Sequence, residues 1–217
     1  MPRLCTSLDR LRADRRGLAL LEFAFTLPIV LVILLWGIEI ANYGVSILRV
    51  HQIAATTADN AARVRDSISE ADVNEVLLGG KIVGEAMGFA KRGRIVLSDV
   101  MPNGKTGTSA GQTILWQRCS GALNTPQSQP QYGRQGKGAN DATLPAMGAA
   151  GRQIAASSSS AMIFAEVTYQ YDPIFSAAVL GTPTIRSEAS FTVRERASET
   201  LNTAPSVTAS ECHRYDL

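Results

Sequence analysis

The sequence predicts an α+β fold, in which a long N-terminal transmembrane helix continues into a domain with a mainly antiparallel sheet. Three observations predict it. Residues 18–38 form an apolar run whose only charged residue is Glu22. Helical spacing of apolar residues continues well beyond that run. After Lys91 the chain changes to short segments rich in branched residues, which are typical of strands.

Residues 1–17 form a short basic leader. They contain five arginines against two aspartates, a net charge of +3, while the remaining chain has 16 basic and 17 acidic residues. A basic arm before an apolar span predicts a cytoplasmic N-terminus, with all that follows the span outside. Nucleic-acid binding is not expected, because the arm lacks aromatic residues and adjoins the span.

Residues 18–40 are predicted to be a transmembrane helix. Residues 18–38 alone would span roughly 31 Å, the thickness of the hydrocarbon core of a bilayer. The run is too long for a secretory signal peptide. Pro28 lies inside it and is expected to kink the helix, because proline removes one backbone hydrogen bond.

Glu22 is the unusual residue of this span. A carboxylate there costs about 2.5–3.5 kcal/mol on insertion scales and usually marks a function. A structural alternative is that Glu22, close to the start of the span, snorkels to the interface. Its position alone does not separate the two interpretations.

The residues around Glu22 carry a resemblance. The stretch RRGLALLEFAFTLPIVLVILLWGIEIANY, with Gly17, Leu18, Glu22 and Phe23 in order, resembles the processing site of type IV prepilin-like proteins. More closely, it is similar to the TadE-like pseudopilins of tight-adherence (Flp-type) pilus systems, over about residues 15–65. The resemblance implies a pilin-like fold and cleavage after Gly17 by a prepilin peptidase.

The resemblance also implies a role for Glu22 and Phe23 in assembly. After cleavage Leu18 would be the new N-terminus, and Glu22 would lie one helical turn away on the same face. In pilin-like fibres the equivalent acid is thought to neutralise the amine of a neighbouring subunit. Neutralisation of its own amine is the competing version, because a buried charge needs some partner.

Residues 41–92 are predicted to be an extracytoplasmic helical region. One helix is expected to continue from Ala41 to about Ser69, with closely spaced alanines forming a slender face. A second helix is expected from Ser69 to about Phe89, although its glycines lower its helix propensity.

Residues 93–196 are predicted to be a β-rich exported domain. The first two expected strands form a hairpin. The expected strands are residues 94–100, 113–119, 161–171 and 184–195, with a short turn or helix at residues 174–180.

Two stretches are predicted to lack regular structure. Residues 121–160 are rich in Gly, Gln, Pro, Ala and Ser, few of which can build a core, so a flexible loop is expected. Residues 197–217 are expected to be a polar tail, mobile unless it is tethered. Cys119 and Cys212 would meet an oxidising compartment and could form a disulfide, or they could be two unrelated thiols.

No catalytic or metal chemistry is predicted. The segment from Gly107 to Gly111 fits the nucleophile-elbow pattern around Ser109, but a turn-like segment, residues 102–105, precedes it and a strand-like segment follows. His51 and His213 have no ligand spacing around them, so no cofactor or metal is expected.

These features favour a membrane-anchored pseudopilin or pilus assembly protein, in the bacterial inner membrane, with a periplasmic or extracellular domain. Its expected partners are a prepilin peptidase, other pilus subunits and assembly proteins, and the membrane. The alternatives are an uncleaved single-pass scaffold of a secretion or pilus complex, and a secreted binding domain.

Overall fold

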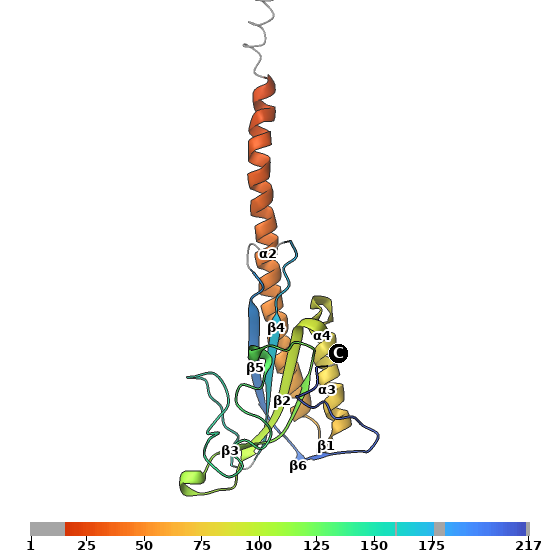
Figure 1. The fold of residues 1–217 in the computed structure, drawn as a ribbon, viewed down its shortest axis with the longest axis vertical. Coiled ribbons are helices and arrows are strands. Elements are labelled where there is room, and N and C mark those ends of the chain that lie inside the picture. The colour runs from red at the N-terminus through yellow and green to blue at the C-terminus, as the bar shows by residue number, and fades with distance from the viewer. Residues whose placement is uncertain (1–15, 159, 176–180, 216–217) are drawn as a thin grey trace, which may run out of the picture.

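Helix α2 (Arg16–Ala62) is 47 residues long, and its two halves have different surroundings. The computed structural model describes residues 16–158, 160–175 and 181–215. Residues 17–38, the free half of α2, extend away from the rest of the chain, whereas residues 39–62, the packed half, lie against the sheet (Figure 1). The helix continues unbroken past Pro28.

Four antiparallel strands form the main sheet, in the order β3-β2-β4-β5. They are β2 (Gly93–Pro102), β3 (Gln112–Ser120), β4 (Met162–Gln170) and β5 (Thr184–Thr192). The hairpin of β2 and β3 pairs Ile95 with Ser120 and Pro102 with Gln112, with a bulge after Asp99. This arrangement confirms the predicted α+β class and the mainly antiparallel sheet.

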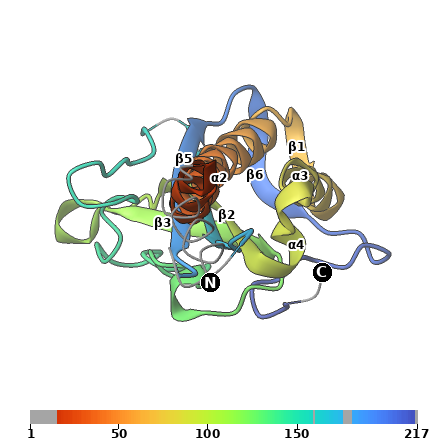
Figure 2. The same cartoon turned by 90° about the horizontal axis from the view of Figure 1, so that it is seen from above.

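The packed half of α2 covers one face of this sheet, chiefly over β4 and β5 (Figure 2). Ala54, Ala58 and Ala61 are fully buried there, because small side chains let the helix approach the strands closely. The core on this face adds Ile53 and Val50 from α2 to alternate residues of the strands. The alanine face recognised in the sequence is therefore a packing face within the chain.

A second helical segment lies beside α2. Helix α3 (Glu70–Val83) begins with a capping box, in which the Ser69 N–H donates to Asp72 Oδ2 at 2.8 Å. Gly80 faces α2 so closely that a Cβ there would lie 2.7 Å from Thr57 Oγ1. The predicted single helix to Phe89 is interrupted after Val83, and a short turn η1 (Glu85–Met87) and helix α4 (Phe89–Arg92) complete the segment.

The structure contains a parallel strand pair that the sequence did not predict. Strand β1 (Asp66–Ser69) pairs with β6 (Arg196–Asn202). The expected continuation of α2 to Ser69 is therefore wrong, since the helix ends at Ala62. Part of the expected polar tail likewise forms β6.

Residues 121–160 cover the other face of the sheet. They contain the short turn η3 (Pro126–Ser128), and η2 (Gly107–Ser109) precedes them in the hairpin loop. Leu144, Met147 and Ala156 are buried against Val100, Ile114, Met162 and Phe164 in a second apolar cluster. The expectation that this stretch contributes little to a core is wrong, because these isolated apolar residues converge on one patch of the sheet.

Candidate assembly site and helix–domain junction

The free half of α2 is an exposed apolar rod. Its large hydrophobic side chains range from 38% exposed at Leu27 to 72% at Leu20. At 1.5 Å per residue it is roughly 33 Å long, which matches the hydrocarbon core of a bilayer. Within the described part of the chain, α2 is the one helix long and apolar enough to cross a membrane. So large an apolar surface requires lipid or other protein around it.

The predicted processing site lies at the tip of this rod. Gly17 and Leu18 are exposed residues in the first turn of α2, where backbone N–H groups have no partner within the helix. A Cβ added at Gly17 would meet no atom within 4 Å. Glycine lowers helix stability and is not needed here for packing, so its presence is not explained by folding.

Glu22 and Phe23 follow on the same exposed segment. Glu22 is four residues after Leu18, so the two side chains share one helix face. Among the described residues, the Glu22 carboxylate has no hydrogen-bond or ion-pair partner; only its backbone carbonyl accepts a bond, from Thr26 Oγ1 at 2.9 Å. The side chain of Phe23 is 59% exposed. Both are open to a partner outside the domain.

Glu39 marks the point where the free half ends, and no role was predicted for it. It is only 1% exposed, although the side chains of Ile38 and Ile40 on either side are more than half exposed. Its carboxylate accepts a hydrogen bond from the Tyr171 hydroxyl. It also accepts the backbone N–H groups of Ile174 and Phe175, each at 3.1 Å.

These bonds fix the start of the β4–β5 connection to α2. Asn42 Nδ2 donates to the Tyr171 hydroxyl at 2.8 Å, and the Tyr43 ring lies edge-on to the Tyr171 ring at 5.1 Å. Burial, together with the adjacent Glu39 carboxylate, raises the pKa of Tyr171 to about 12, so the phenol keeps its proton and remains a donor. Tyr43, which follows the apolar span, thus packs on the domain. A second acid directly after the apolar span was the available sequence signal.

Cys119 in strand β3 and Cys212 in the C-terminal segment form a disulfide across a sequence separation of 93. The segment is also held by Arg94, a buried residue whose guanidinium donates to the carbonyls of Cys212 and Arg214. The Tyr215 ring lies 4.1 Å from that guanidinium. The pairing that the sequence left open is therefore present, and it ties the described end of the chain to the sheet.

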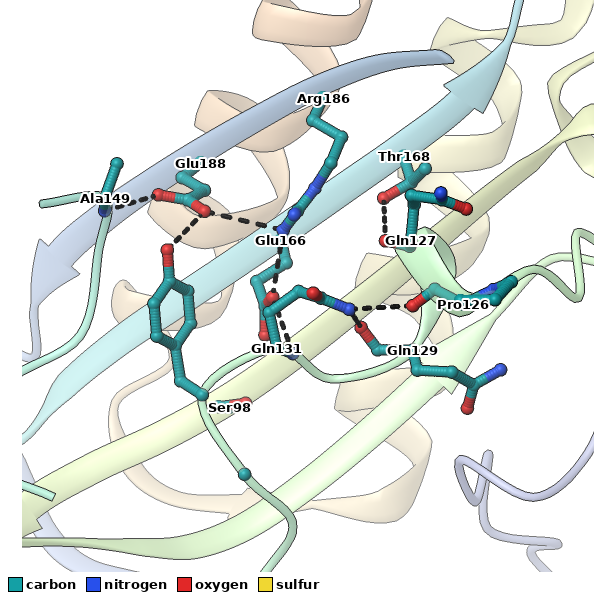
Figure 3. A network of polar contacts seen from close by, with 12 residues as sticks. Ser98, Pro126, Gln127, Gln129, Gln131, Ala149, Glu166, Thr168, Arg186 and Glu188 are labelled. Carbon is teal, nitrogen blue, oxygen red and sulfur yellow. Dashed lines mark hydrogen bonds and ion pairs between the residues drawn. The ribbon is translucent and has the colours of Figure 1, made fainter. Parts of the chain in front are cut away.

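Polar side chains on the face of the sheet opposite α2 bind residues 121–160 to the strands (Figure 3). Glu188 accepts hydrogen bonds from the Tyr132 hydroxyl at 2.6 Å and from the Ala149 N–H at 3.2 Å. Glu166 accepts the Gln131 N–H at 3.1 Å. Burial raises the pKa of Glu166 to about 7. This network is a structural attachment of the long segment to the sheet.

The geometry around Ser109 does not reproduce a nucleophile elbow. Ser109 ends the short turn η2, and strand β3 follows it after two residues where the motif requires a helix.

A contact that the sequence did not predict joins Ser187 Oγ to His51 Nδ1 at 2.7 Å. Ser187 belongs to β5 and is buried, and His51 belongs to α2, so this hydrogen bond links the two elements. Within the described residues, no cluster of three or more His, Cys, Asp or Glu side chains could hold a metal ion.

No protein-family model, curated protein or solved structure matches the chain. The fold and the site define its class: an α+β domain on a long helix whose N-terminal half is apolar and free.

Proposed function

We propose that this chain is a single-pass membrane pseudopilin, or pilus assembly protein, of a tight-adherence pilus system. The free half of α2 would cross the bacterial inner membrane, and a prepilin peptidase would cut after Gly17. The observation that carries the proposal is the exposed apolar rod, which ends at Gly17, Leu18 and Glu22 and continues without a break into the helix packed on the sheet.

Two observations support an exported domain. The basic leader favours a cytoplasmic N-terminus, which leaves residues 41–217 on the opposite side. The disulfide between Cys119 and Cys212 suits an oxidising compartment such as the periplasm.

The chemistry of the rod tip supports an assembly role for Glu22. A carboxylate within the membrane needs an opposite charge or hydrogen-bond donors, and Glu22 finds neither among the described residues. Cleavage would create an ammonium group at Leu18. In a packed array of these helices, the amine of a neighbouring subunit would neutralise Glu22, and its own amine would be the alternative partner.

Processing is tested by Gly17→Leu, with Gly37→Leu as the matched control. Both glycines lie in the free half of α2, and a Cβ at either meets nothing within 4 Å. In cells with a prepilin peptidase, Gly17→Leu should accumulate as the full-length precursor, because the added side chain blocks the scissile bond. Gly37→Leu should be processed like the wild type. Normal loss of the leader from Gly17→Leu would refute cleavage at this bond.

Assembly is tested by Glu22→Ala, with Thr26→Ala as the control one turn away on the same exposed segment. Glu22→Ala should insert into membranes normally but yield few or no pili in the sheared fraction, whereas Thr26→Ala should assemble. Wild-type levels of pili from Glu22→Ala would reject the charge-pairing role. Wild-type protein that stays unprocessed in the membrane and is absent from the pilus fraction would instead favour the uncleaved scaffold.

A further inference from the structure

Two exposed apolar residues lie where the free half of α2 meets the domain. Ile174 and Phe175 follow β4 and are 56% and 49% exposed. The described parts of the connection between β4 and β5, residues 171–175 and 181–183, lie at the end of the domain from which the free half of α2 emerges (Figure 1). Exposed aromatic and aliphatic side chains at such a junction need an explanation that packing within the domain does not give.

The backbone of this pair is held in place by α2 itself. The N–H groups of Ile174 and Phe175 both donate to the carboxylate of Glu39, the first residue after the free half. Each bond is 3.1 Å long, and the Glu39 side chain is buried beneath them. The two side chains are therefore fixed at the level where the apolar rod ends, with the backbone donors already satisfied, as a segment in contact with lipid requires.

An ion pair joins α4 to the segment that carries the apolar pair. Arg92, at the end of α4, forms a 2.8 Å ion pair with Asp172, two residues before Ile174. Lys91 precedes it in the same helix and is exposed. The ion pair attaches the segment before Ile174 to α4, so this segment is held from a second side.

We propose that Ile174 and Phe175 insert into the membrane interface and hold the exported domain against the bilayer surface. Their partner is lipid, because the pair continues the exposed apolar surface of the free half. Glu39 would set the depth of insertion by fixing both backbone N–H groups to the end of the rod. The inference rests on membrane insertion of α2 but not on processing or pilus assembly.

The test uses the full-length protein in vesicles of phosphatidylcholine and phosphatidylglycerol. A Cys5→Ser background leaves no free thiol, since Cys119 and Cys212 are joined. Phe175→Cys carries an environment-sensitive fluorophore, and Ile174→Cys is a second site in case the first disturbs folding. Phe191→Cys is the control: its side chain is 37% exposed, and it pairs with Ile163 at the opposite end of β4 and β5. Leu34→Cys reports insertion of the rod.

The label at residue 175 should show blue-shifted emission and lose most of its intensity to spin-labelled lipid. The label at residue 191 should emit as in water and be quenched by aqueous iodide. If the labels at 174 and 175 behave like the label at 191 while the label at 34 is quenched by lipid, the domain is not held against the bilayer and the inference fails. If the label at 34 is not quenched by lipid either, insertion of α2 fails as well. A blue shift at 175 without lipid quenching would assign the surface to a second copy of the chain and overturn the inference.

Discussion

Removing the disulfide by Cys119→Ser and Cys212→Ser should lower the free energy of unfolding by about 4 kcal/mol. The bond closes a loop of 93 residues, and the chain-entropy model assigns about 4–5 kcal/mol to a loop of that size. For a chain of this length, that loss corresponds to a fall in melting temperature of roughly 8–16 °C.

The variant without the disulfide should keep its native fold, because hydrogen bonds also hold the C-terminal segment. Arg94 donates to the carbonyls of Cys212 and Arg214, and the Cys119 N–H donates to the Ser210 carbonyl at 2.7 Å. Ser210 Oγ also donates to Asn74 Oδ1 at 2.6 Å. The cost should therefore appear as easier global unfolding, with little change in the spectrum of the folded state.

The assay is urea unfolding of the full-length protein in detergent micelles, followed by the fluorescence of the buried Trp116 in a Trp36→Phe background. Cys5→Ser is the control for a cysteine outside the bridge. Unfolded wild-type protein should have one free thiol and gain two on reduction. A loss of stability below about 1 kcal/mol, or three free thiols without reductant, would refute the reasoning.

Three further predictions concern single side chains. Burial, reinforced by Glu199, raises the pKa of Asp99 to about 8, so the folded state keeps a proton that the unfolded state releases. The urea midpoint should therefore fall as the pH rises from about 4 to about 8, and Asp99→Asn should flatten that profile. A profile unchanged by the variant would exclude Asp99 as its cause. Glu39→Ala should speed amide hydrogen exchange at residues 174 and 175 without loss of helix content, because those N–H groups lose their acceptor; unchanged exchange would mean that the carboxylate does not hold them. Gly80→Leu should cost about 1–3 kcal/mol in urea unfolding, because its Cβ would lie 2.7 Å from Thr57 Oγ1 of α2. Gly79→Leu has open space and should be neutral or stabilising, and equal losses from the two variants would contradict the packing of α3 on α2.

The main elements of the fold were predictable because their signals are local. The apolar run before Glu39 predicts a helix long enough to span a bilayer and exposed outside the domain. The alternation in residues 161–171 predicts a strand with two different faces. The hairpin of β2 and β3 follows from two branched segments joined by a turn-rich loop.

The parallel pair of β1 and β6 was not predictable for the opposite reason. Strand β1 has four residues, and β6 is largely polar and exposed, so neither has an apolar period. Their pairing joins segments about 130 residues apart, such as Asp66 and Arg196. It depends on the position of the end of α2, because β1 follows that helix directly.

The candidate site was predictable only in part. Gly17 and Glu22 are recognisable because their spacing is itself the signal. The role of Glu39 depends on Tyr171, Ile174 and Phe175, which are distant in sequence and meet it only in the folded chain. In the same way Leu144 and Met147 join a core only because the sheet places a complementary patch beneath them.

The central claim is most directly tested by the N-terminal residue of the protein recovered from bacterial membranes that contain a prepilin peptidase. The proposed function predicts a chain that begins at Leu18, with a mass reduced by that of residues 1–17. A chain that still begins at its original N-terminus would contradict processing and leave an uncleaved anchor. A chain that begins beyond Ala41 would contradict membrane assembly altogether, because the free half of α2 would have been removed.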